Sequence, residues 1–239
     1  MRLITTSWDD GHPLDFRLAE LLEKYGLKAT FYIPLQNPER EVMKPEAVKE
    51  LGRTFEIGGH TLNHVKLDGY DEWLFEAEIR GSFTWLHDLL GKEPVSFCFP
   101  LGAYNQASIQ AVFRYGYKVA RTTELLSLAS FTRNMVSPTS LQVYEHSSST
   151  YLKHMLKRRK LIRIMKWLTG NSWSSLPLLA ERFVSQVIKH EGCFHLWGHS
   201  WEIEQYHLWR KLEEIFKIIS NHPEISYVSN QGLVRNSTV

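Results

Sequence analysis

Two pairs of reactive side chains follow predicted strands. Asp9 and Asp10 come directly after the apolar run at residues 2–8. His60 and His64 follow a later strand-like run at residues 54–57. On a helical turn, side chains four residues apart project the same way, so both imidazoles could reach one ion. Two histidines and one carboxylate suffice for a catalytic metal with positions left open for water and substrate.

Each pair alone also has a simpler interpretation. Asp10-Gly11 is typical of an ordinary turn, and His60 and His64 could be surface or helix-capping side chains. The paired glycines Gly58 and Gly59 favour a site, because they let the backbone turn sharply and approach a ligand. Since both pairs lie at predicted strand ends, we expect them to meet.

The elements that must position these residues alternate between strand and helix. Strands are predicted over 2–8, 30–33, 54–57, 95–99, 117–121, 140–144, 193–197 and 225–228. Helices are predicted over 14–25, 45–52, 71–90, 106–115, 149–168, 176–190 and 203–220. This alternation indicates an α/β fold with a largely parallel sheet, and such folds build their sites where strands end.

Length and composition are those of a globular protein. The 239 residues predict a single domain over 1–239, with 43% hydrophobic and 23% charged residues. No apolar run exceeds three residues, which excludes a transmembrane helix. The net charge of +2 is too small to suggest a nucleic-acid partner.

The N-terminus and the cysteines predict a cytoplasmic location. The chain enters a strand-like run within its first residues, without an apolar signal core. Cys98 and Cys193 both lie in apolar, strand-like runs, so we expect reduced and buried thiols rather than a disulfide framework.

The order of the two motifs resembles the NodB-type polysaccharide deacetylases, the family 4 carbohydrate esterases. Thr6-Ser7-Trp8-Asp9-Asp10-Gly11 is similar to their Thr-Phe-Asp-Asp-Gly motif, and His60-Thr61-Leu62-Asn63-His64 matches their His-Ser/Thr-x-x-His motif. The resemblance extends from residue 3 to about 228. It implies a distorted, incomplete β/α barrel. It also implies one divalent metal, usually zinc, on Asp10, His60 and His64, with Asp9 as the catalytic base.

The third family motif, Arg-x-Pro-x-Gly, is altered here. The matching stretch begins at Cys98 and keeps only Pro100 and Gly102. In the family the arginine holds the base aspartate, which a cysteine cannot do because it has no charge and only a weak S–H donor. We expect Arg121, after the next strand, to replace it in a direct contact with Asp9; a surface arginine is the alternative. The backbone of Leu101 is a candidate oxyanion donor.

The last family motif carries the histidine that protonates the leaving amine. Here both His195 and His199 are available, and we favour His199 because it follows the strand, whereas His195 lies within it. Trp197, with Leu196, could wall a pocket for an acyl methyl or simply pack in the core. The family's Asp-x-x-Asp-Trp motif has no clear match, so Glu202 or Glu204 is expected to orient the acid.

One segment is strongly basic. Residues 151–170 contain seven lysines and arginines and no acid, and without them the formal net charge falls from +2 to −5. An amphipathic outer helix over 151–168 with a solvated basic face is the plainer interpretation. The other is a peripheral contact with an anionic membrane surface or glycan carrier.

These observations predict a metal-dependent hydrolase that removes an N-acyl group, N-acetyl above all, from a sugar or glycoconjugate. One alternative is a hydrolase of a non-sugar amide on the same fold. The other is a carbohydrate-binding domain whose site has decayed, for which Cys98 is the main support. The oligomeric state is not predicted.

Overall fold

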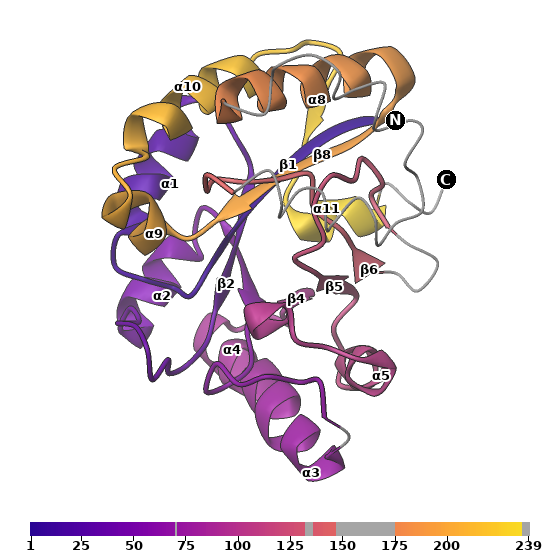
Figure 1. Ribbon diagram of the computed structural model, residues 1–239. Helices are drawn as coiled ribbons and strands as arrows, with labels where there is room; N and C mark the ends of the chain where they lie inside the picture. Colours follow the sequence, from indigo (N-terminus) through magenta and orange to yellow (C-terminus); the bar gives the residue numbers. More distant parts are fainter. Residues whose placement is uncertain (70, 132–135, 147–174, 236–239) are drawn as a thin grey trace.

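The computed structural model describes residues 1–69, 71–131, 136–146 and 175–235 (Figure 1). Its strands are β1 (Arg2–Asp9), β2 (Ala29–Ile33), β3 (Glu56–Gly59), β4 (Ser96–Cys98), β5 (Val119–Arg121), β6 (Val136–Ser137), β7 (Leu141–Gln142), β8 (Gly192–Gly198) and β9 (Ser226–Tyr227). Its α-helices are α1 (Asp15–Lys24), α2 (Pro45–Leu51), α3 (Glu72–Phe75), α4 (Gly81–Leu90), α5 (Gln106–Arg114), α8 (Leu176–His190), α9 (Ser200–Gln205), α10 (Trp209–Ile219) and α11 (Asn230–Arg235). A π-helical turn, Glu76–Arg80, joins α3 to α4, and a 3-10 turn covers Pro100–Gly102.

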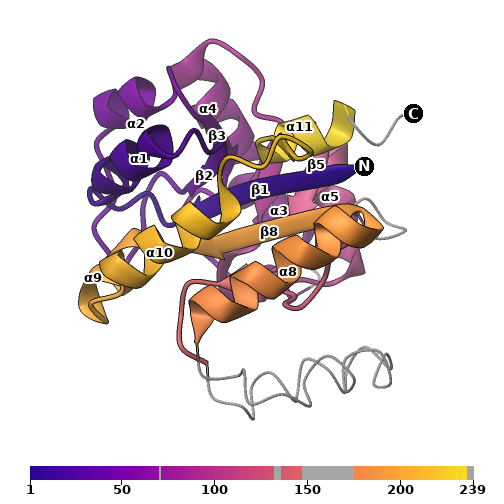
Figure 2. The same cartoon turned by 90° about the horizontal axis from the view of Figure 1, so that it is seen from above.

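The described strands form one parallel sheet that curls on itself. The order is β6-β5-β4-β3-β2-β1-β8-β7, and β9 also pairs with β1. The outermost strands, β6 and β7, are separated in sequence only by residues 138–140. Four Cα–Cα steps span at most about 14 Å, so the two edges of the sheet must approach each other. Figure 2 shows the helices arranged around this sheet. The expected distorted, incomplete β/α barrel is confirmed.

The side chains of β1 separate an apolar exterior from a polar interior. Ile4 and Trp8 belong to the core shared with the helices, and Trp8 meets Phe216 of α10 edge-on with ring centroids 6.1 Å apart. Thr5 and Ser7, which point to the opposite face, bond the polar side chains of Asn230 and His195. Alternation along a strand therefore gives one face to the helices and the other to the barrel interior.

Helix α11, which the sequence did not predict, packs against the strands at their N-terminal halves. The backbone N–H of Asn230 donates to Thr30 Oγ1 at 2.9 Å, and its side chain donates to the Tyr32 hydroxyl at 2.6 Å. The next N–H, of Gln231, donates to Glu56 Oε2 at 2.8 Å. Six residues are too few for a helical period to be visible in sequence.

Other boundaries also differ from the predictions. The single helix predicted over 203–220 is two helices, because His207 takes a left-handed φ of 54° and the N–H of Leu208 bonds back to Ile203. The strand predicted over 140–144 is the two-residue β7, and β6 was missed. The predicted helix over 149–168 lies outside the described residues. Within the described part of the chain, no helix is long and apolar enough to span a membrane.

Candidate active site

A pocket of about 370 Å³ opens where the strands end. Because all paired strands are parallel, the residues that end or follow them come to one edge of the sheet. The pocket is lined by seven of the eight residues expected from the sequence, namely Asp9, Asp10, His60, His64, Leu101, Trp197 and His199. The eighth, Arg121, does not line the pocket but is fully buried in contact with Asp9.

Asp10, His60 and His64 form a compact set of potential metal ligands. Asp10 Oδ1 lies 3.5 Å from His60 Nε2 and 3.1 Å from His64 Nε2, and all three side chains are buried. One donor atom from each lies within 4.8 Å of the others. Although Asp10 Oδ1 is buried, it has no hydrogen-bond partner. A carboxylate oxygen left unpaired between two imidazole nitrogens fits a bound cation.

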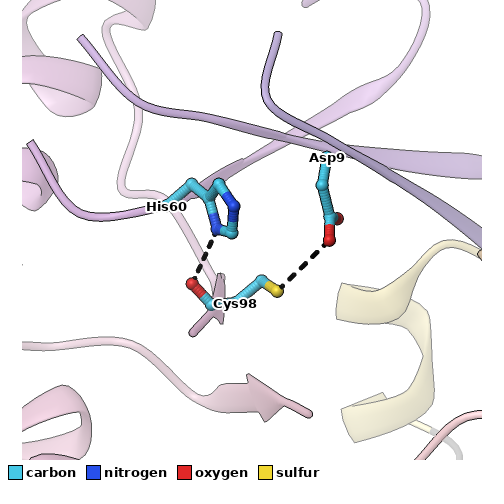
Figure 3. A group of neighbouring side chains, drawn as sticks. All are labelled: Asp9, His60 and Cys98. Carbon is cyan, nitrogen blue, oxygen red and sulfur yellow. Dashed lines mark hydrogen bonds between the residues drawn. The ribbon is translucent and has the colours of Figure 1, made fainter. Parts of the chain in front are cut away.

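Hydrogen bonding at the second ring nitrogen orients His60. Its Nδ1 lies 2.9 Å from the carbonyl oxygen of Cys98, as Figure 3 shows. A carbonyl only accepts, so Nδ1 carries the proton and Nε2 keeps its lone pair toward Asp10. This is the arrangement that metal-binding histidines require. Burial raises the pKa of the Asp10 carboxyl, but contacts with His60 and His64 outweigh that effect and lower it.

The two histidines do not share a helical turn, so that part of the sequence interpretation is wrong. Residues 60–64 form a bent loop in which Thr61 and His64 have left-handed φ angles of 58° and 53°. Glu78 of the π-helical turn holds this loop: it accepts from the N–H groups of Leu62 and Asn63 at 3.0 and 2.8 Å. The loop conformation therefore depends on a buried carboxylate outside the motif.

The glycines before His60 serve close packing rather than a sharp turn. Both lie inside β3. A Cβ at Gly59 would lie 2.1 Å from the Tyr117 hydroxyl, so no larger residue fits there. A left-handed backbone is needed instead after β1, where Asp10 and Gly11 have φ angles of 78° and 63°. That turn aims Asp10 at the loop carrying His60.

Arg121 makes the expected direct contact with Asp9, through a single hydrogen bond. Its Nη2 donates to Asp9 Oδ1 at 2.7 Å, while Nε and Nη2 both donate to Ser7 Oγ at 3.2 Å. Arg121 is fully buried, and its guanidinium lies 4.5 Å from the Trp197 ring centroid. Burial alone lowers the pKa of Arg121, but Asp9 and other neighbours more than offset this and raise it. The cation beside Asp9 is therefore permanent.

Cys98 contacts the other carboxylate oxygen of Asp9. Its Sγ lies 3.7 Å from Asp9 Oδ2 (Figure 3), whereas Arg121 bonds Oδ1. Burial raises the pKa of this thiol well above its usual value, so it remains a neutral S–H. The second cysteine, Cys193, is also free and buried, as expected.

His199 and His195 differ as the sequence suggested. His195 is 1% exposed and its Nε2 lies 2.8 Å from Ser7 Oγ. Because Ser7 already accepts from Arg121, its hydroxyl proton is free for His195 Nε2. Burial, together with Arg121, holds the pKa of His195 well below its usual value. It is therefore a neutral histidine of the barrel interior.

His199 lines the pocket and is paired with a carboxylate. Its Nδ1 lies 3.1 Å from Glu202 Oε2, which also accepts from the Gln142 side chain at 3.1 Å. Burial lowers the pKa of His199, but Glu202 and the aspartates of the site outweigh it and raise that pKa. Glu204 is exposed and bonds Arg17 and Trp209 instead. Of the two glutamates proposed as the orienting acid, the structure therefore brings only Glu202 to His199.

The two expected substrate-binding residues lie at different depths. Leu101 stands at the rim, 59% exposed, with a left-handed φ of 56° inside the 3-10 turn. Trp197 is 5% exposed and packs edge-on to His199. Its neighbour Leu196 is fully buried in the core and lines no part of the pocket.

Several residues at the site were not recognised in the sequence as part of it, and four of them bond residues described above. Trp201, which lines the pocket, donates from Nε1 to Asp10 Oδ2 at 2.8 Å. Ser7 accepts a hydrogen bond from Arg121, and Glu78 accepts one from the loop that carries His60. Gln142 donates to Glu202. Trp201 and Ser7 carried a signal, since Trp201 lies two residues after His199 and Ser7 two residues before Asp9.

A curled parallel β/α barrel with this two-histidine, one-carboxylate set defines the NodB-type class, the family 4 carbohydrate esterases. The sequence model of the family described as polysaccharide deacetylase matches residues 1–120. The chain therefore belongs to the polysaccharide deacetylase family.

Individual relatives agree with this assignment. The chain is 27% identical over 126 residues to YxkH of Bacillus subtilis (strain 168), provisionally named a polysaccharide deacetylase. That match covers 52% of this chain and 45% of YxkH, so the chain spans less than half of that relative.

Two solved structures show the same fold. One is the Xyl-CE4 domain of a multidomain xylanase from the hindgut metagenome of Trinervitermes trinervoides, with 15% identity, a TM-score of 0.62, and coverage of 100% of this chain and 92% of that one. The other is a provisionally named polysaccharide deacetylase from Mycobacterium smegmatis, with 13% identity, a TM-score of 0.66, and coverage of 98% and 90%.

Proposed function

We propose that this protein is a metal-dependent hydrolase that removes an N-acyl group, N-acetyl above all, from a sugar of a polysaccharide or glycoconjugate. The observation that carries the proposal is the buried cluster of Asp10, His60 and His64, in which Asp10 Oδ1 has no hydrogen bond. An Arg121-bound aspartate and a carboxylate-paired histidine flank it. Membership of the deacetylase family supports the same reaction.

The donor set suits one divalent cation, which we propose to be zinc, on Asp10 Oδ1, His60 Nε2 and His64 Nε2. When bound, such a cation lowers the pKa of a coordinated water toward neutrality and polarises an amide carbonyl.

Asp9 is the proposed general base. Arg121 fixes its Oδ1, so Oδ2 is the oxygen that accepts the proton of the attacking water. Arg121 stays charged, so it orients the carboxylate without taking that proton. It thus takes the role that the third-motif arginine has in the family.

His199 is the proposed general acid. Its Nδ1 is held by Glu202, which leaves Nε2–H to protonate the leaving nitrogen as the C–N bond breaks. Water supplies the hydroxyl of the carboxylic acid product, and the amine leaves with the proton from His199. Trp197 would wall the acyl group, and the backbone of Leu101 would face the carbonyl oxygen.

The test is a screen of the zinc-loaded protein against N-acetylated mono- and oligosaccharides, with simple N-acetyl amides in parallel. We expect acetate from sugars, with equal amounts of free amine. Release from simple amides alone would favour the non-sugar hydrolase. Stoichiometric zinc binding without any turnover would favour the decayed carbohydrate-binding domain. Cys98, in place of the motif arginine, supports that alternative, whereas the contact of Arg121 with Asp9 argues against it.

A further inference from the structure

The two oxygens of the Asp10 carboxylate have different partners, and Trp201 bonds one of them. Its indole N–H donates to Oδ2 at 2.8 Å, while Oδ1 faces His60 and His64 without a hydrogen bond. An indole N–H is a donor only, so it bonds the carboxylate without offering it an acceptor. The oxygen bonded to Trp201 is thereby kept out of the cluster, and the other is left for a cation.

Two other side chains contact the indole ring. The His199 ring contacts the Trp201 ring, with centroids 5.2 Å apart and an interplanar angle of 36°. The Arg40 guanidinium lies 4.1 Å from the Trp201 ring centroid. The cation–π contact with Arg40 and the ring contact with His199 both favour the position of the indole from which its N–H reaches Asp10.

Helix α9, which carries Trp201, is anchored at its first turn. Ser200 Oγ donates to Asp15 Oδ1 of α1 at 2.5 Å, and both residues are fully buried. Glu202, one residue after Trp201, bonds His199. Ser200, Trp201 and Glu202 therefore bond Asp15 of α1, Asp10 and His199 in turn. Ser200, Trp201 and Glu202 are not themselves members of the metal-ligand set.

We infer that Trp201 is a positioning residue for the metal ligand Asp10: its indole N–H holds the carboxylate so that a single oxygen, Oδ1, serves the cation. This inference rests on the metal site of the proposed function. Partners that bond a ligand from outside the coordination sphere typically change metal affinity by about 10–100-fold. The same short helix thus fixes both the metal ligand and the acid His199.

The experiment is a zinc titration of the full-length protein against a chromophoric chelator, without substrate. Trp201→Phe removes the N–H and keeps an aromatic ring that can contact His199 and Arg40. We expect zinc to bind about 10–100-fold more weakly, and the d–d absorption bands of the cobalt(II)-loaded protein to shift. Trp73→Phe, at a tryptophan that is 76% exposed on α3, is the matched control and should bind zinc as the wild type does.

A second variant removes the donor alone. Benzothienylalanine at position 201 has sulfur in place of the indole N–H and nearly the same shape, so it remains informative if Trp201→Phe does not fold. It should show the same loss of zinc affinity. Wild-type affinity with an unchanged cobalt spectrum in either folded variant overturns the inference while the proposed function stands. A wild-type protein that binds no zinc overturns the metal site itself.

Discussion

Cys98 and Arg121 are register partners on the adjacent parallel strands β4 and β5, and both side chains reach Asp9. The sulfur approaches Oδ2 and the guanidinium bonds Oδ1. Cys98 stands at the motif position that is arginine in the resembled family, and the arginine of this chain, Arg121, lies beside it on the next strand. The charge beside the aspartate is retained although its strand of origin has changed.

Arg121→Lys should lower turnover. An ammonium group cannot bond Asp9 and Ser7 in the geometry that the guanidinium achieves with Nε and Nη2, and a misplacement of about 1 Å can cost about 10²-fold in rate. The measurement is kcat on the substrate found by the screen. Arg114→Lys, at an exposed ion pair with Glu72, is the control and should leave kcat unchanged. Full activity of Arg121→Lys would show that Asp9 needs no guanidinium.

His60→Ala and His64→Ala should each abolish stoichiometric metal binding. Either change removes one of the three donors of the Asp10, His60 and His64 cluster, and zinc sites normally need at least three protein ligands. Metal content after dialysis, measured by elemental analysis, should fall from about one ion per chain to a small fraction. Circular dichroism should show a folded protein in both cases. Retained zinc in both variants would mean that the ion lies elsewhere.

Asp9→Asn should keep the metal and lose rate. Asparagine retains an acceptor for Arg121 but cannot take a proton from water, and general-base catalysis contributes about 10²–10⁴-fold. Parallel measurements of zinc content and kcat separate the two effects. If turnover stays near normal, another residue is the base.

Glu202→Gln should move the alkaline limb of the pH–rate profile to lower pH. The acid must be protonated, so activity falls as pH rises through the pKa of His199. Burial lowers that pKa, and Glu202 is the first of the groups that raise it. Without its charge the pKa falls, and the protonated form is lost sooner. Glu204→Gln, on the same helix but exposed, should leave the profile unchanged. Identical profiles for wild type and Glu202→Gln would remove Glu202 from this role.

Glu78→Ala should weaken the His60 loop. The change leaves the N–H groups of Leu62 and Asn63 without their acceptor, at a cost of about 1–3 kcal/mol in free energy of unfolding. Zinc affinity should fall with it, because His60 and His64 flank these residues. Chemical denaturation and zinc titration measure both. Glu76→Ala, at an exposed position of the same π-helical turn, should change neither. An unaffected zinc affinity would show that the loop holds its shape alone.

The sequence predicted the residues of the site better than their local conformations. The meeting of Asp9, His60 and Arg121 could be predicted because each ends or follows an apolar run, and parallel strands end together. The turn joining His60 to His64 could not, since its shape comes from Glu78, which is distant in sequence. Trp201 was missed for a similar reason, because its bond to Asp10 spans nearly the whole chain.

The pairing of β1 with β8 has a consequence for how the protein is made. Thr5 lies beside His195 in the register, so β1 is synthesised well before β8, the strand that pairs with it over most of its length. At about 5–20 residues per second, a ribosome needs on the order of ten seconds or more between them. During that interval the nascent β1 has an unpaired edge, and Asp10 has no Trp201 to bond. Such non-local pairing is typical of slow folding, and the site is completed only when α9 has left the ribosome.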